Sequence, residues 1–186
     1  MKKDKTTIRA KREGYKARSV YKLFAINNKY RLIKKGDRVL DLGCWPGSWL
    51  QACLRFKAFV VGVDLRKTEI DGAETIIGDV TEGSVLEKIE SYGEFDVVIS
   101  DMAPNTSGRL DLDTLRSYKL SARAFVIAER VLKKNGNFLV KVFQSRYTDD
   151  LYSTVRKKFS FAKIYKPQTS KKRSKEIYIV ACGYKG

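Results

Sequence analysis

The chain has 186 residues, of which 43% are hydrophobic, and its formal net charge is +17. That length supports one substantial hydrophobic core and is short for two, so we expect a single domain over residues 19–186. The charge is segregated: residues 1–22 hold nine Lys or Arg against two acids, and residues 156–186 hold ten against one. A near-neutral body with basic ends suits a polyanion, so nucleic acid is favoured over an anionic membrane or merely solvated lysines.

The chain contains no histidine, which excludes Ser-His-Asp and Cys-His triads and most catalytic zinc sites. Its three cysteines, Cys44, Cys53 and Cys182, form no C-x-x-C pair, so neither a disulfide framework nor a metal site is expected. The N-terminus lacks the apolar stretch of a signal peptide, and no apolar run approaches about 18 residues. We therefore expect a soluble, cytoplasmic protein without a membrane partner.

In chain order, residues 1–18 are polar and basic without apolar periodicity, which favours a mobile or partner-ordered RNA-binding arm over a folded element. From Ser19, a candidate N-cap, apolar residues at near-helical spacing predict a helix to about residue 30. Lys22 lies in its first turn.

Beyond residue 37, short apolar runs alternate with longer amphipathic ones. The pattern predicts strands at 39–42, 59–65, 75–77, 95–101 and 138–143, and helices at 49–56, 85–92 and 115–132. Such alternation is typical of a parallel sheet with helices on both faces. After a helix at 149–159, strands 162–165 and 177–182 flank a polar loop with no room for a helix, which predicts an antiparallel C-terminal hairpin.

The segment 39–49 reads as an apolar strand that breaks into a glycine- and proline-containing turn and opens a helix. Gly43 and Gly47 would let the backbone approach a ligand at the carboxyl end of the strand, where open α/β folds bind ligands. The turn is neither a Walker loop nor G-x-G-x-x-G, so diphosphate binding is disfavoured. The sequence therefore predicts a nucleoside-cofactor pocket.

Two acids follow the next two predicted strands. Asp64 could accept both ribose hydroxyls, and Asp79 could face an adenine amino group, so that together they outline an adenosine. A single strand-end Asp is more often a cap or turn residue, and the ordered set is what favours the ligand interpretation. Trp49, in the first turn of the following helix, is consistent with core packing or with ligand contact.

Four charged residues lie at the ends of predicted core elements: Lys22, Asp101, Lys141 and Glu176. Burying a charge there costs free energy, so such residues are expected mainly where the charge has a function. Two buried Lys–acid ion pairs would be the purely structural explanation. Four converging charges beside a cofactor crevice favour a catalytic site.

The chain resembles the FtsJ/RrmJ-type ribosomal RNA large-subunit 2′-O-methyltransferases (RlmE family) from about residue 16 to 182. The resemblance rests on residues 19–23, 41–43 with 46–49, Asp64, 78–79, 100–105 with 107–108, 140–144 and 174–180. It implies a Rossmann-like methyltransferase fold, an S-adenosylmethionine cofactor, a large-subunit rRNA or assembled-subunit substrate and, we expect, a monomer. It also implies a Lys22-Asp101-Lys141-Glu176 tetrad, and cofactor contacts from Gly43, Gly47, Trp49, Asp64, Asp79 and Asp101.

Two positions depart from the family pattern. Cys44-Trp45 replaces small residues, and Ser48 replaces a common glycine, so both could reshape the methionine end of the pocket. Other substrates and roles stay open: the tRNA anticodon loop, more distantly an mRNA cap, and a non-catalytic ribosome-assembly protein. DNA or protein methylation is disfavoured because no N-P-P-Y or comparable motif is present.

For the implied reaction, Lys141 is the candidate general base. An ordinary lysine has a pKa of about 10.4 and is protonated at pH 7, so this role needs surroundings that favour the neutral amine. We hypothesise that Asp101 orients Lys141, Lys22 steers the substrate oxygen or phosphate, and Glu176 holds a lysine in place. RNA would contact basic residues at the two ends: Lys2, Lys3, Lys5, Arg9, Lys11, Arg12, Lys16, Arg18, Lys171, Lys172, Arg173 and Lys175.

Overall fold

The computed structural model describes residues 5–168 and 174–186. Five of the basic residues expected to meet RNA lie outside the described residues: Lys2, Lys3, Lys171, Lys172 and Arg173. Within the described part, no helix is both long and apolar enough to cross a membrane.

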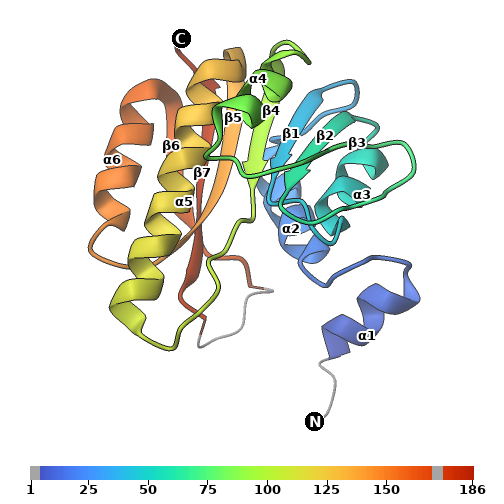
Figure 1. Cartoon of the computed structure of the whole chain (residues 1–186), viewed down its shortest axis with the longest axis horizontal. Coiled ribbons are helices and arrows are strands. Elements are labelled where there is room, and N and C mark those ends of the chain that lie inside the picture. Colours follow the sequence, from blue (N-terminus) through green and yellow to red (C-terminus); the bar gives the residue numbers. More distant parts are fainter. Residues whose placement is uncertain (1–4, 169–173) are drawn as a thin grey trace.

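The described residues form a seven-stranded sheet with the order β3-β2-β1-β4-β5-β7-β6 (Figure 1). The strands are β1 Arg38–Leu42, β2 Phe59–Asp64, β3 Glu74–Ile77, β4 Phe95–Ser100, β5 Leu132–Phe143, β6 Phe159–Tyr165 and β7 Glu176–Tyr184. Pairs from β3 to β5 are parallel, whereas β7 runs antiparallel to both β5 and β6. The predicted mostly parallel sheet with an antiparallel C-terminal hairpin is confirmed.

Helices cover both faces of this sheet, as the alternation predicted (Figure 1). They are α1 Lys5–Arg12, α2 Val20–Tyr30, α3 Ser48–Arg55, α4 Gly83–Glu90, α5 Leu110–Val131 and α6 Thr148–Lys158. Alternate strand residues face opposite sides: Val39 packs with residues of α2 and α3, and Leu40 packs with residues of α4, α5 and α6. The two cores together hold the carboxyl ends of the parallel strands at one edge.

Residues 5–18 are folded, so the expectation of no folded element there is wrong. α1 buries Ala10, and Tyr15 packs edge-to-face on Phe24 with ring centroids 5.7 Å apart. The side-chain amide of Gln51 on α3 donates to the Gly14 carbonyl at 2.9 Å. Apolar periodicity missed this element because a single small residue and polar contacts hold it against the body.

The two boundaries that differ most from prediction are the starts of α5 and β5. α5 begins at Leu110 rather than at 115, because the Asp113 carboxylate accepts hydrogen bonds from the backbone N–H groups of Ser107 and Gly108 and orders the approach to the helix. β5 begins at Leu132, directly after α5, rather than at 138. Ser19 precedes α2 as predicted, but its side chain makes no capping bond to that helix.

Candidate active site

The four predicted catalytic residues meet at the carboxyl edge of the sheet. Lys141 near the end of β5 pairs in register with Tyr178 on β7, and Glu176 opens β7 opposite Phe143. Asp101 follows β4, which is the neighbour of β5 on its other side. Lys22 reaches the same place from the first turn of α2.

Their side chains form a continuous chain of contacts. The Lys22 ammonium Nζ donates to Glu176 Oε2 at 2.7 Å, and Lys141 Nζ lies 4.0 Å from Glu176 Oε1. Lys141 Nζ also donates to the Asp101 backbone carbonyl at 2.6 Å and lies 3.0 Å from Asp101 Oδ1. The structure therefore brings together all four residues in the order Lys22, Glu176, Lys141, Asp101.

The cluster is largely removed from water. The side chains of Lys22 and Lys141 are 11% and 5% exposed. Burial raises the pKa of Glu176, but the hydrogen bond and charge of Lys22 and the charge of Lys141 outweigh burial, so that its pKa lies below the ordinary value. Glu176 is thus an anion held between two lysines.

Tyr178 is a fifth member of the cluster that sequence reasoning left unassigned. It is fully buried, and its hydroxyl donates to Asp101 Oδ1 at 2.8 Å. Burial and the neighbouring Asp101 carboxylate raise its pKa well above the ordinary value, so it stays a neutral donor. Its position two residues after Glu176 on the same strand was the available signal, because alternate strand residues share a face.

The glycine turn lies one strand away, at the end of β1. Gly43 and Gly47 have φ values of 81° and 105°, where glycine is favoured. A Cβ on Gly43 would lie 2.5 Å from Met102 Cγ, and one on Gly47 would lie 2.7 Å from Ile70 Cδ1. These glycines therefore allow the loops at this edge to pack closely on one another.

The two predicted adenosine-binding carboxylates are engaged by backbone donors. Asp64 accepts the N–H groups of Trp45 at 3.0 Å and Arg66 at 2.9 Å, one on each oxygen, and so ties together the loops after β1 and β2. Asp79 Oδ1 accepts from the Thr81 N–H and hydroxyl, which lower its pKa. The turn role and the ligand role are compatible, because each carboxylate oxygen has two lone pairs.

Asp41 on β1 was not predicted as a site residue, although it is a charged residue inside an apolar run. It is fully buried, and among the described residues neither carboxyl oxygen has a hydrogen-bond partner. Burial, then the negative charges of Asp101 and Asp64, raise its pKa well above the ordinary value. Asp41, Asp64 and Asp101 thus lie at or near the carboxyl ends of three neighbouring strands, β1, β2 and β4. Carboxyl oxygens in this arrangement fit a cationic nucleoside such as S-adenosylmethionine.

The residues that depart from the family pattern lie on different sides of the turn. Cys44 and Ser48 are buried, and the Ser48 hydroxyl lies 2.9 Å from that of Ser19. Trp45 is 49% exposed, with the Arg66 guanidinium 4.4 Å from its ring centre.

Trp49 is buried and donates its indole N–H to the Ser19 carbonyl at 3.0 Å, which accounts for a packing role. Its contact with cofactor stays a prediction.

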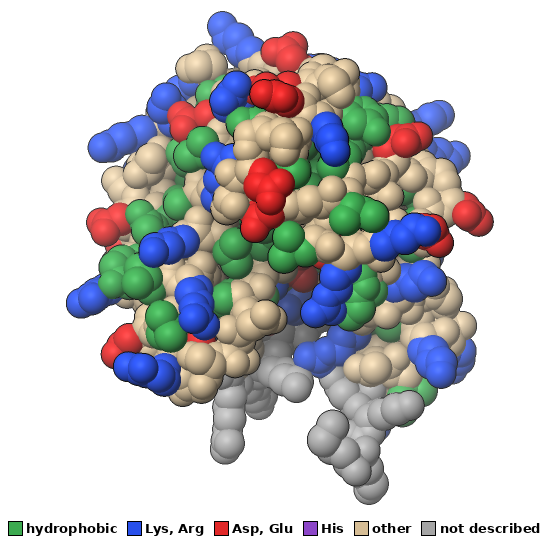
Figure 2. Space-filling model, viewed as in Figure 1, with side chains coloured by type: hydrophobic (Ala, Val, Ile, Leu, Met, Phe, Trp, Pro, Cys, Tyr) green, Lys and Arg blue, Asp and Glu red, His purple; other side chains and the backbone are tan. Residues whose placement is uncertain are grey.

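A cavity of about 370 Å³, which we call the substrate cavity, opens beside the tetrad. Glu176 lines it together with Arg18, Thr106 and Lys175. Figure 2 shows Lys and Arg side chains on both sides of the hollow at the lower edge of the molecule, which is the edge where the parallel strands end in Figure 1. The charge around the hollow suits an anionic chain.

Comparisons with known proteins point to one family. Residues 15–184 match the model of the FtsJ-like methyltransferase family. A Methanothrix thermoacetophila protein named ribosomal RNA large subunit methyltransferase E is 48% identical over 96% of this chain and 71% of its own length. A protein of the same name from Archaeoglobus fulgidus is 42% identical over 92% and 91%. A crystal structure described as that of a ribosomal RNA methyltransferase from Plasmodium falciparum superposes with a TM-score of 0.83 at 27% identity, over 92% of this chain and all of that one.

Proposed function

Because the chain belongs to the FtsJ-like methyltransferase family, we propose that it methylates a ribose 2′-hydroxyl, at a uridine, in large-subunit ribosomal RNA. The observation that carries the proposal is the contact chain from Lys22 through Glu176 and Lys141 to Asp101, at the edge of the sheet where the parallel strands end. A binding protein needs net charge but does not need this buried set.

S-adenosylmethionine, when bound, supplies an electrophilic methyl group on a sulfonium. Asp64 and Asp79 would hold the ribose and adenine, and the backbone at Gly43 and Gly47 would line the turn. Asp101 would place negative potential near the cationic end of the ligand, whereas Asp41, which burial keeps neutral, would add no charge there. The chain's own task is then to align the RNA hydroxyl and assist its deprotonation.

Lys141 is the proposed base, acting at Nζ. Once the Lys141 ammonium has given up one proton, its amine can donate its two remaining hydrogens to the two Asp101 oxygens that lie within 3.0 Å of Nζ, and its lone pair is left for the hydroxyl proton. General-base assistance of this kind contributes about 10²- to 10⁴-fold. Lys22 neutralises Glu176 and presents a cation to the RNA oxygens, and alignment draws on the roughly 7–11 kcal/mol open to well-oriented reactions.

RNA would lie along the hollow and meet the basic ends of the chain. Within the described residues, Lys5, Arg9, Lys11 and Arg12 belong to α1, which flanks this edge (Figure 1). Residues 1–18 would thus act as an RNA-binding extension, of which the described part, residues 5–18, is docked on the body. Binding through many phosphates predicts affinity that falls steeply with salt.

The test is methyl transfer from labelled S-adenosylmethionine to undermodified large ribosomal subunits, naked large-subunit rRNA, bulk tRNA and protein in separate reactions. Label in rRNA that survives alkali within dinucleotides and disappears with Lys141→Ala supports both the substrate and the 2′-O position. Label in tRNA alone would redirect the substrate. Cofactor binding without transfer to any RNA would favour the assembly-protein role.

A further inference from the structure

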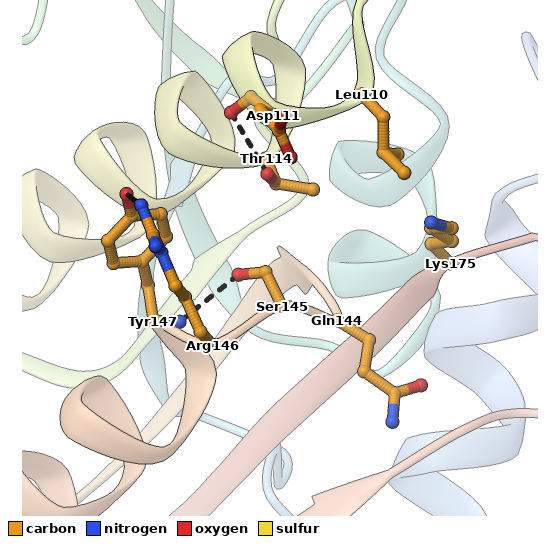
Figure 3. Close-up of a pocket in the computed structure, with 8 residues that line it drawn as sticks. All are labelled: Leu110, Asp111, Thr114, Gln144, Ser145, Arg146, Tyr147 and Lys175. Carbon is orange, nitrogen blue, oxygen red and sulfur yellow. Dashed lines mark hydrogen bonds between the residues drawn. The ribbon is translucent and has the colours of Figure 1, made fainter.

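A second cavity, of about 350 Å³, lies beside the substrate cavity. We call it the flanking pocket, and its walls come from the first turn of α5, the segment after β5 and the residue before β7. Figure 3 shows Arg146 and Tyr147 on one side of it and Leu110 and Lys175 on the other. Its volume is near the lower end of the range of small-molecule sites, about 300–1,000 Å³, which suits one small group.

The flanking pocket and the substrate cavity share two lining residues, Leu110 and Lys175. The Gln144 backbone N–H donates to the Lys175 carbonyl at 2.9 Å, which fixes the segment after β5 against the start of β7. Glu176, the next residue, lines the substrate cavity. A chain that threads the substrate cavity therefore passes directly into the flanking pocket.

Tyr147 provides a fixed aromatic surface in this pocket. Its ring packs on Tyr118 of α5 with centroids 5.3 Å apart and planes tilted by 30°. Arg146 donates to its hydroxyl at 2.8 Å and places its guanidinium 4.9 Å from the ring centre. A ring held from two sides loses little entropy when a base stacks on it.

Exposed polar groups surround the aromatic ring. The side-chain amide of Gln144 and the ammonium of Lys175 make no hydrogen bond or ion pair with any other described residue. Leu110 is 52% exposed although it is apolar. The pocket thus combines apolar and aromatic surface, two cations, one acid, Asp111, and an unengaged amide. The ring, the cations and the amide are the groups that bind the base and phosphate of single-stranded RNA.

We propose that the flanking pocket holds the nucleotide adjacent to the methylated one. Its base packs between Tyr147 and Leu110, its phosphate meets Arg146 and Lys175, and the Gln144 amide reads a base edge. This inference rests on the proposed RNA methyltransferase function and adds the part of the substrate that selects the site. The target nucleotide is then recognised in single-stranded form together with its neighbour.

The test uses an undermethylated large-subunit rRNA transcript on which the modified nucleotide is first mapped with the wild-type enzyme. Short RNAs around that nucleotide are then made intact, or with an abasic residue on one side or the other. Tyr147→Ala should raise KM for the intact RNA by about 5- to 100-fold, the range for losing one base–aromatic stack. Tyr147→Phe keeps the ring and should stay within about threefold of wild type.

The abasic RNA separates recognition from a merely structural effect. On the abasic RNA whose missing base occupies the pocket, Tyr147→Ala and wild type should have the same KM. Arg146→Ala and Lys175→Ala should each reduce the salt slope of RNA binding by about 0.7, unlike exposed Arg156→Ala on α6. Cofactor affinity and the melting temperature, measured alongside, report whether each variant is folded.

Equal KM values of wild type and folded Tyr147→Ala on intact RNA would overturn the pocket assignment while leaving the methyltransferase function in place. An equal loss on intact RNA and on both abasic RNAs would overturn it too. If Tyr147→Ala does not fold, Arg146→Ala/Lys175→Ala with an unchanged salt slope would have the same meaning. A wild-type enzyme that transfers no methyl group to the transcript would instead remove the proposed function, and the pocket assignment with it.

Discussion

Replacing Asp41 with Asn should change how the free energy of unfolding depends on pH. The Asp41 carboxyl is fully buried without a described hydrogen-bond partner, and Asp101 and Asp64 add negative potential, so its pKa in the folded protein is well above the ordinary value. In the unfolded chain it titrates near the reference value of about 3.9. The unfolded state therefore releases this proton at lower pH than the folded state does.

The sign follows from proton linkage. A raised folded pKa means that stability is greatest below the unfolded pKa and falls as pH rises towards the folded pKa. Over that interval the loss is about 1.4 kcal/mol per pH unit. Asn cannot titrate, so the variant does not lose stability in this way. From pH 5 upward, the unfolding free energy of Asp41→Asn minus that of wild type should therefore increase by about 1.4 kcal/mol per pH unit, until the pH passes the folded pKa of Asp41.

Urea unfolding of the cofactor-free proteins at several values between pH 5 and 8 measures this slope. A constant offset from the unpaired Asn amide does not affect it. Asp96→Asn is a matched control. Burial raises the pKa of Asp96, but hydrogen bonds from Lys133 and the Arg38 N–H outweigh burial, so that the pKa lies below the ordinary value. The stability that charged Asp96 contributes is therefore lost only below pH 5, and Asp96→Asn should show no slope between pH 5 and 8. Parallel curves for Asp41→Asn and wild type from pH 5 to 8 would refute the conclusion that folded Asp41 is neutral.

Three further results are expected. Tyr178→Phe should lower the free energy of unfolding by about 1.5–3 kcal/mol, because it removes a hydrogen bond to the Asp101 carboxylate, and it should reduce kcat more than cofactor affinity; stability within 0.5 kcal/mol of wild type would contradict this. Lys22→Met should destabilise more than the double variant Lys22→Met/Glu176→Leu in denaturant unfolding, since the single change strands a partly buried anion; strict additivity would mean that the 2.7 Å pair is uncoupled. Trp45 fluorescence should change on adding S-adenosylmethionine while Trp45→Phe loses that signal, because exposed Trp45 adjoins Asp64; an identical response of both proteins would place the cofactor elsewhere.

Much of the fold follows from local patterns in the sequence. Strands such as 39–42 and 95–100 are continuous apolar runs, because a central parallel strand is buried on both faces, and they were predicted to within about a residue. α1 was missed because its attachment depends on Gln51, which is distant in sequence. The start of α5 was missed because the Asp113 carboxylate organises residues ahead of it.

The candidate site was predictable to the extent that it consists of charges in apolar surroundings. Lys141 and Glu176 stand out for that reason, and the structure brings them within 4.0 Å of each other. The alternation from Glu176 placed Tyr178 on the same face of its strand, but the use of its hydroxyl was not predictable, because an aromatic residue in a strand has the same pattern whether its hydroxyl is used or not. The flanking pocket was not predictable either. Tyr147 gains its surface from Tyr118, a pairing that only the packing of α5 reveals.

The strand that completes the sheet, β7, follows all the other described strands in the sequence. β7 lies between β5 and β6 and carries Glu176 and Tyr178, and the Lys22–Glu176 bond joins residues 154 positions apart. During synthesis β7 therefore leaves the ribosome after the other six described strands. The four charged residues can therefore meet only after β7 has been made, and a chain that stops before Glu176 cannot form the Lys22–Glu176 pair.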